Sequence, residues 1–226
     1  IKTIILTGHR RIPVVTKSND LIGIITYMDI LDMLLRRTSL NAKVESFMTR
    51  EIVFSDHTDT VDNALQKMKL SHRGGVPVTK KGKLIGLVSE RDFIQHSNKH
   101  ISIPVSEIMS HKPFYVSPKT SISNTMKTMV NTHYRRLPIV DGKEVVGIVT
   151  GLDILKHLQD TNFNQIYLND NVEEIMATPV FHTFEYSDVS DAIRIILDNK
   201  IGGVVVVNES NNLKGIITER DIIEIL

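Results

Sequence analysis

The stretch GIVTGLD at residues 147–153 decides the fold, because it is one of four occurrences of a single pattern. The pattern is a Gly, two apolar residues, a Ser or Thr, two variable residues and an Asp. Its other occurrences are GIITYMD at 23–29, GLVSERD at 86–92 and GIITERD at 215–221. One such heptapeptide would be weak evidence, but four at nearly even spacing indicate an internal repeat.

The residues around the pattern predict the same elements in every copy. After a short extended segment comes an amphipathic helix, since Val189, Ala192 and Ile196 share one helical face. A strand follows, such as 136–140, and the turn at Asp141 and Gly142 leads into a second strand that carries the Gly-apolar-apolar triplet. The Ser or Thr then begins a second helix, so the predicted order is β-α-β-β-α.

A single copy cannot fold alone, because three strands with one apolar sheet face need a partner. The predicted fold class is therefore mixed α/β (α+β), with four β-α-β-β-α repeats arranged as two pseudo-twofold pairs. The simplest pairing joins copy 1 to copy 2 and copy 3 to copy 4. The predicted copies occupy 1–38, 44–98, 105–159 and 172–226, with linkers near 36–43, 98–102 and 159–171. Ile1 aligns with Leu65, so we expect copy 1 to be truncated at its N-terminus and the chain to be a fragment.

Composition narrows the class of protein. Hydrophobic residues make up 41% of the chain, which is enough for a core, and the formal net charge is only +1. The chain has no Cys, which excludes disulfides and thiolate chemistry and favours an intracellular, cytoplasmic location. No apolar run approaches the roughly eighteen residues of a membrane span. The balanced charge also argues against a nucleic-acid surface.

The strand with its Pro, the repeated Gly-to-Asp pattern and the Met that begins copies 2 to 4 resemble the CBS domain family, named after cystathionine β-synthase. The resemblance covers nearly the whole chain. CBS domains pair into Bateman modules, and four in one chain are similar to the γ subunit of AMP-activated protein kinase and its archaeal relatives. The resemblance implies a regulatory module that binds AMP, ADP or ATP in clefts between paired copies. It implies no further cofactor, an unidentified regulated protein as partner, and a compact four-repeat monomer or homodimer.

The resemblance also assigns roles to the Asp and the hydroxyl residue of each pattern. It implies that the Asp binds the ribose hydroxyls, and that the Ser or Thr lies near ribose or phosphate. The aspartates are Asp29, Asp92, Asp153 and Asp221, and the hydroxyl residues are Thr26, Ser89, Thr150 and Thr218. The spacing alone favours another interpretation, since Ser/Thr-x-x-acid at a helix start is a capping box. The two roles can coexist.

Basic residues alternate between the copies. Copies 1 and 3 carry Arg pairs before the first hairpin strand, where copies 2 and 4 carry Gly pairs, and copies 2 and 4 place an Arg inside the pattern instead. Arg supplies forked donors to phosphate, so we predict phosphate contacts, although solvated surface arginines are the plain alternative. The predicted phosphate-binding residues are Arg10, Arg11, Arg135, Arg136, Arg91 and Arg220. His133 is a further candidate, and the alternative for it is a histidine in a surface turn without a ligand.

Nothing in the chain predicts an enzyme. It shows no nucleophile with a base, no metal-ligand spacing and no phosphate-binding Gly loop, so we expect no catalytic residue and no metal site. Three alternatives stay open beside nucleotide sensing. They are an S-adenosylmethionine or methylthioadenosine-binding CBS protein, the regulatory part of a larger enzyme such as an inosine monophosphate dehydrogenase, and a nucleic-acid-binding CBS protein.

Overall fold

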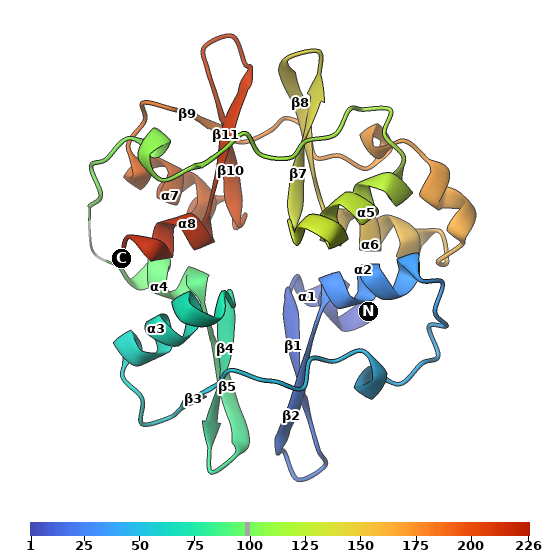
Figure 1. The fold of residues 1–226 in the computed structure, drawn as a ribbon, viewed down its shortest axis with the longest axis vertical. Coiled ribbons are helices and arrows are strands. Elements are labelled where there is room, and N and C mark those ends of the chain that lie inside the picture. The colour runs from blue at the N-terminus through green and yellow to red at the C-terminus, as the bar shows by residue number, and fades with distance from the viewer. Residues whose placement is uncertain (98–99) are drawn as a thin grey trace. The chain divides into compact units, whose positions relative to one another are not determined.

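The computed structural model describes residues 1–97 and 100–226, so the first two residues of the predicted linker 98–102 lie outside the described residues. It confirms a mixed α/β fold in which the same elements recur along the chain (Figure 1). Copy 1 comprises α1 (Lys2–Thr7), β1 (Arg11–Val15), β2 (Leu21–Thr26) and α2 (Tyr27–Leu35). Copy 2 comprises β3 (Ser55–Asp56), α3 (Val61–Ser71), β4 (Gly75–Lys80), β5 (Lys83–Ser89) and α4 (Glu90–His96).

The second half of the chain repeats this order. Copy 3 comprises β6 (Ser110–His111), α5 (Ile122–Thr132), β7 (Arg136–Asp141), β8 (Glu144–Thr150) and α6 (Gly151–Asp160). Copy 4 comprises β9 (His182–Phe184), α7 (Val189–Asp198), β10 (Gly203–Val207), β11 (Leu213–Thr218) and α8 (Glu219–Glu224). Short 3-10 turns η1 (Val44–Ser46), η2 (Val105–Glu107), η3 (Gln165–Asn169) and η4 (Val172–Glu174) lie between these elements.

Each copy is built around an antiparallel hairpin. In copy 3, β7 pairs with β8 so that Pro138 lies opposite Ile148. Gly142 in the connecting turn has a φ of 61°, a left-handed conformation that suits Gly. The predicted strand, turn and strand are therefore confirmed, and each hairpin delivers its Ser or Thr to the start of a helix.

The described residues form two compact units, and each combines segments from distant parts of the chain. Unit 1 consists of Ile1–Val14, Gly23–Arg50 and Phe114–Val180. In it α2 of copy 1 packs on α5 and α6 of copy 3 around fully buried Leu31, Met126 and Leu155. Gly151 permits a close approach there, because a Cβ on it would lie 2.6 Å from Cε2 of Tyr27.

Unit 2 consists of Val15–Ile22, Glu51–Pro113 and Phe181–Leu226. Its helices come from copies 2 and 4, since α4 packs on α7 and α8, and α3 packs on α8. Ile94, Val189, Ile196 and Ile222 are buried in its core. Within each unit, helices therefore pair copy 1 with copy 3 and copy 2 with copy 4, a contact that the predicted pairing of neighbours did not include.

Neighbouring copies meet through the segments that begin with the 3-10 turns. We call residues 44–49, 105–110 and 172–177 the entry segments. In unit 1, Met48 of copy 2 lies against Gly23 of copy 1, and Met176 of copy 4 lies against Gly147 of copy 3. In unit 2, Met109 of copy 3 lies against Gly215 of copy 4. Copies 3 and 4 thus exchange entry segments reciprocally, as a pseudo-twofold pair does.

Candidate functional site

The Asp of every pattern caps the helix that it begins. In all four copies one carboxylate oxygen, Oδ2, accepts hydrogen bonds from both the backbone N–H and the hydroxyl of the Ser or Thr three residues earlier. In copy 3 these distances from Asp153 to Thr150 are 2.9 and 2.6 Å. The predicted capping box is confirmed at each helix. The cap uses Oδ2 and leaves the other oxygen outside its hydrogen bonds.

The cap also limits what the hydroxyl can do. A hydroxyl has one hydrogen to donate, and Thr150 donates it to Asp153. While the cap is intact, Thr150 can accept a hydrogen bond from a ligand but cannot donate one to a phosphate oxygen. A ligand group beside Thr150 would therefore have to donate a hydrogen bond to its hydroxyl.

Asp221 lies in a partly enclosed site within unit 2. Burial raises the pKa of Asp221 above its usual 3.8, while hydrogen bonds from Thr218 and Ser110 act in the opposite direction. Ser110 belongs to the entry segment of copy 3, and it pairs with Ile216 where β6 joins β11. An entry segment therefore forms one wall beside this carboxylate.

The two Arg pairs of copies 1 and 3 converge on one buried phenol in unit 1. Burial raises the pKa of Tyr27, and the positive charges of Arg135, Arg136, Arg10 and Arg11 oppose that rise. The Tyr27 hydroxyl donates a 3.4 Å hydrogen bond to the carbonyl oxygen of Arg135. The structure thus brings the four predicted phosphate-binding arginines of these copies into one neighbourhood, which a polyvalent anion would suit. Their contact with phosphate stays a prediction.

Arg91 and Arg220, the other two predicted phosphate contacts, hold the helices of unit 2 together. Arg91 donates to the carbonyls of Lys200 and Ile201, just beyond α7, at 3.2 and 2.5 Å, and its Nε lies 2.7 Å from Glu219 Oε1. These bonds fix the chain that follows α7 against the start of α4. These contacts favour a structural role for Arg91, and its contact with phosphate stays a prediction.

Arg220 makes the reciprocal set of contacts. It donates to the carbonyls of Met68 and Lys69 in the last turn of α3 at 3.0 and 2.9 Å, and it lies 3.8 Å from buried Glu90. Sequence reasoning missed Glu90 and Glu219, although the repeated Ser/Thr-Glu-Arg-Asp of copies 2 and 4 is a signal that could have identified them. Arg91 of copy 2 thus binds backbone carbonyls of copy 4 and lies beside buried Glu219, and Arg220 of copy 4 binds carbonyls of copy 2 and lies beside buried Glu90.

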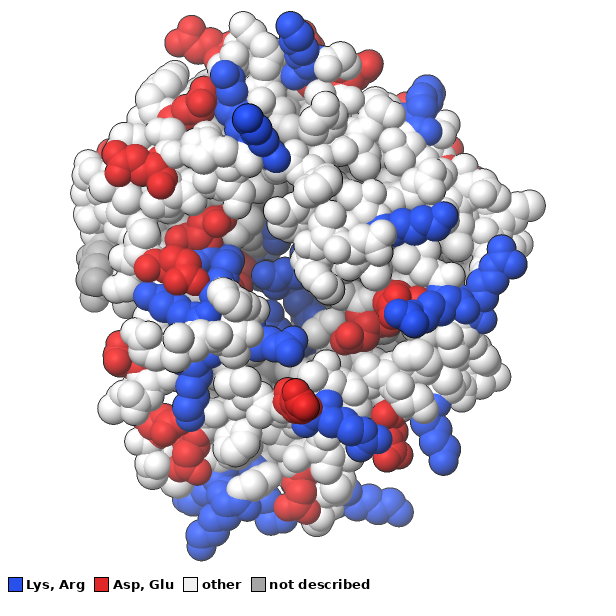
Figure 2. Space-filling model, in the orientation of Figure 1, with Lys and Arg blue, Asp and Glu red and all other residues white. Residues whose placement is uncertain are grey.

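His133 ends α5 in a left-handed conformation with φ 59°, and it is exposed. The structure places it two residues before Arg135, and its contact with phosphate also stays a prediction. On the face drawn in Figure 2, basic and acidic side chains intermingle. Among residues 1–97 and 100–226 no group of three or more His, Asp or Glu could hold a metal ion. No helix in that part of the chain is long and apolar enough to cross a bilayer.

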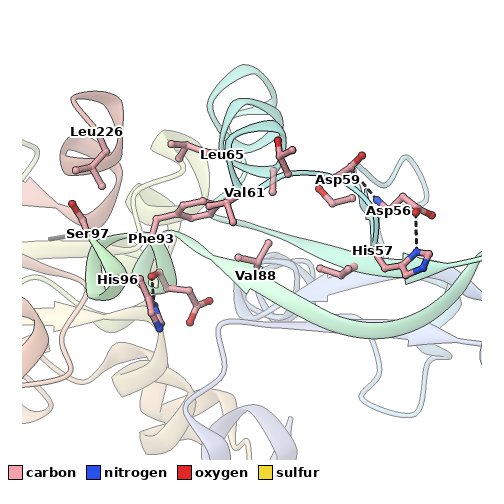
Figure 3. Close-up of a pocket in the computed structure, with 15 residues that line it drawn as sticks. Asp56, His57, Asp59, Val61, Leu65, Val88, Phe93, His96, Ser97 and Leu226 are labelled. Atoms are coloured by element: carbon pink, nitrogen blue, oxygen red, sulfur yellow. Dashed lines mark hydrogen bonds and ion pairs between the residues drawn. The ribbon is translucent and has the colours of Figure 1, made fainter. Parts of the chain in front are cut away.

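A cavity of about 570 Å³ lies beside Asp92 in unit 2. Val61 and Leu65 of α3, Val88 of β5 and Phe93 of α4 surround it, as Figure 3 shows. Sequence reasoning named only Asp92 here. Sequence reasoning did not predict the apolar wall, and Val189, the equivalent of Val61 in copy 4, is buried in a core instead.

Comparison with known proteins identifies the repeat. The CBS domain model matches residues 1–36, 44–99, 105–160 and 172–226. Protein MJ1225 of Methanocaldococcus jannaschii is 30% identical over 244 residues, covering 96% of this chain and 87% of that protein. Its crystal structure, described as that of a candidate archaeal homologue of g-AMPK, has a TM-score of 0.90 at 28% identity and covers 99% of this chain and 90% of that chain.

A solved CBS domain pair gives a second comparison. The pair of protein MJ0100, in complex with 5′-methylthioadenosine and S-adenosyl-L-methionine, is 30% identical with a TM-score of 0.50, covering 55% of this chain and 95% of that one. A 33.4 kDa protein in a ribosomal RNA operon of Thermofilum pendens is 32% identical over 151 residues, covering 62% of this chain and 50% of that protein.

Proposed function

The chain belongs to the CBS domain family, and on that premise we propose that it is a regulatory module that binds AMP, ADP or ATP and signals its occupancy to a partner protein. One observation carries the proposal: each cap Asp holds its helix with one carboxylate oxygen and keeps the second outside the cap. A ribose diol presents two hydroxyl donors, and a carboxylate oxygen accepts them. Asp29, Asp92, Asp153 and Asp221 are the proposed ribose ligands.

The arginines support a ligand with phosphate. Arg10, Arg11, Arg135 and Arg136 all act on the same phenol of Tyr27, so four positive charges from two copies are concentrated in unit 1. A nucleotide phosphate would suit such a positively charged neighbourhood, because arginines bind phosphate through charge-assisted hydrogen bonds.

S-adenosylmethionine and methylthioadenosine form the second candidate class. The CBS domain pair of protein MJ0100 is solved with both compounds, and it is 30% identical to this chain. A ligand of this class would use the cap aspartates in the same way, but it has no phosphate for the arginine cluster. Comparing the two classes therefore tests the role of the arginines.

Calorimetric titration separates these candidates. We expect AMP or ATP to bind more tightly than adenosine or S-adenosylmethionine. The double variant Arg135→Ala plus Arg136→Ala should weaken AMP binding by about tenfold or more and leave adenosine binding unchanged, because a lost charge-assisted hydrogen bond costs at least that much. The Tyr27 contact with the Arg135 backbone survives this change. Lys119→Ala, which removes an exposed Lys paired with Glu173, is the matched control.

A second variant tests the ribose contact. Asp153→Asn keeps one oxygen that can accept the hydrogen bonds from Thr150 in the capping box, but it replaces the other oxygen with a donor. We expect weaker binding of AMP and unchanged binding of the 2′,3′-dideoxy analogue. Equal effects on both ligands would refute the ribose role. Hydrogen exchange with and without AMP would then show which helix ends change on occupancy, the step that a partner protein would detect.

A further inference from the structure

A third pair of adjacent arginines lies outside the repeat, in the linker between copies 1 and 2. The pairs at 10–11 and 135–136 occupy equivalent positions in copies 1 and 3, whereas the pair at 36–37 aligns with Asp160 and Thr161. Thr38 and Ser39 follow this third pair. No other Ser or Thr in the sequence has arginines at both the second and the third position before it. Neither the repeat nor the proposed ligand accounts for this arrangement.

The structure places this pair at a turn that ends α2 in unit 1 (Figure 1). Arg37 has a φ of 55°, and its N–H donates to the carbonyl of Leu34 at 3.0 Å. The next N–H, that of Thr38, donates to the carbonyl of Met33 at 3.1 Å. This is a Schellman arrangement, which satisfies the last carbonyls of the helix. The residues that follow are therefore presented from a defined helix end.

Both guanidinium groups of this pair are accessible to another protein. Nε of Arg36 lies 2.9 Å from Oδ2 of Asp32, and the two side chains are 72% and 37% exposed. An ion pair as exposed as this one contributes little, so a carboxylate of another protein can take the place of Asp32. Arg37 is exposed as well. The linker thus presents two guanidinium groups side by side in the sequence.

Ser39 is the exposed hydroxyl that follows them. Its Oγ accepts a 3.2 Å hydrogen bond from the N–H of Asn41, and accepting this bond does not use the hydroxyl hydrogen. The stretches LNAKVESFM at 40–48 and LNDNVEEIM at 168–176 align, so Ser39 is equivalent to Tyr167. Tyr167 is 39% exposed. Exposure is therefore a property of this linker position in both halves of the chain.

We propose that Ser39 is a phosphorylation site for a protein kinase that recognises arginines at the third and second positions before the hydroxyl. Carboxylates of the kinase bind Arg36 and Arg37 through the forked hydrogen bonds that guanidinium groups form. The co-substrate is a nucleoside triphosphate. Oγ of Ser39 forms a bond to the γ-phosphorus, the bond from that phosphorus to the β–γ bridging oxygen breaks, and the nucleoside diphosphate leaves. The hydroxyl proton passes to the catalytic carboxylate of the kinase.

Phosphorylation would change the charge beside the end of α2. A phosphoserine carries a charge of about −1.5 to −2 at pH 7 and three acceptor oxygens. It is a stronger acceptor than the exposed carboxylate of Asp32, so we expect Arg36 to exchange Asp32 for the phosphate. Met33 and Leu34 in the same turn are buried in the core of unit 1, so the exchange acts on a helix end that belongs to that core.

A kinase assay on the folded chain tests the site. The probe is the catalytic subunit of cyclic-AMP-dependent protein kinase, which selects arginines at these two positions, with magnesium ATP. We expect one phosphate per chain, located at Ser39 by peptide mass spectrometry, and none on Ser39→Ala. Arg36→Ala plus Arg37→Ala should lower kcat/KM by about tenfold or more. Arg50→Ala, which removes another exposed Arg paired with a Glu, is the matched control and should react like the native chain.

Two further measurements complete the test. NMR should show the Nε–H resonance of Arg36 shifting on phosphorylation, and mass spectrometry of the protein isolated from its own cells should find phosphate at Ser39. Four results would overturn the proposal: phosphorylation of the peptide 33–45 but not of the folded chain, phosphate at Thr38 instead, equal rates for the double Arg variant, and no phosphate at Ser39 in cells. An unmoved Arg36 resonance would overturn the exchange at α2. None of these measurements involves AMP, so their failure leaves the proposed function untouched.

Discussion

A methyl group added at Gly215 tests whether entry segments hold the copies together. The Cβ of Gly215→Ala would lie 2.5 Å from Sδ of Met109 and 3.0 Å from the carbonyl oxygen of Ser110. Met109 is 5% exposed, and Ser110 is held by the pairing of β6 with β11. Moving either residue away from the new Cβ would therefore cost packing or backbone hydrogen bonds. Overpacking of this kind costs about 1 to 3 kcal/mol.

The net effect is smaller, because Ala is better than Gly in a strand by about 0.5 to 1 kcal/mol. The difference between the two contributions is about 0 to 2.5 kcal/mol, so we expect Gly215→Ala to lower the free energy of unfolding by about 1 kcal/mol. For a chain of this length the Tm would fall by about 2 to 4 °C. Gly86→Ala is the matched control, since its Cβ meets nothing within 4 Å. Its Tm should be unchanged or slightly higher.

Urea unfolding and thermal unfolding, both followed by circular dichroism, give these values. The double variant Gly215→Ala plus Met109→Ala should lose less stability than the sum of the single variants, because removing the Met side chain removes the clash. Two results would refute the reasoning. One is equal destabilisation by Gly86→Ala and Gly215→Ala, and the other is additive behaviour of the double variant.

Three further predictions concern the helix contacts of each unit. Gly151→Ala should cost about 1 to 3 kcal/mol in urea unfolding, because its Cβ would lie 2.6 Å from Cε2 of Tyr27; a neutral result would contradict the close packing. Arg91→Ala should cost about 3 kcal/mol or more, since it leaves buried Glu219 without its 2.7 Å partner, and adding Glu219→Gln should restore part of the loss. Asp221 has a folded-state pKa raised above its unfolded 3.8, so folding favours its protonated form. Its contribution to stability should fall as pH rises from 3.8 through the folded pKa. Asp221→Asn should remove that slope, which urea unfolding at several pH values measures, and an unchanged slope would assign it to other groups.

The local elements of the fold were predictable from the sequence, because the signals for them are local. The Thr150 and Asp153 spacing predicts a capping box, and the turn at Gly142 predicts a hairpin; the structure shows both. The β-α-β-β-α order follows from the same short-range patterns. These interactions span three to ten residues, so the sequence order itself brings the partners together.

The long-range contacts were not predictable in the same way. Arg91 was predicted to bind phosphate because it alternates with the Arg pairs, yet its partners Lys200 and Ile201 are more than a hundred positions away. Repetition shows that units are alike, but it does not show which helix packs on which. The identical spacing of Met109 and Met176 likewise indicated a repeated element without revealing that each docks on the other's copy.

The exchange of entry segments has a consequence for how the chain folds during synthesis. Copy 1 obtains Met48 only after copy 2 has begun to emerge from the ribosome, and copy 3 obtains Met176 only with the start of copy 4. Met109 must wait longer for its partner, because Gly215 lies more than a hundred residues further along the chain. Closing such a long loop slows folding, and exposed apolar surface meanwhile favours aggregation. A chaperone, or early pairing of copies 1 and 2, would protect the chain from aggregation most in the interval after residues 105–110 are made and before copy 4 is available to bind them.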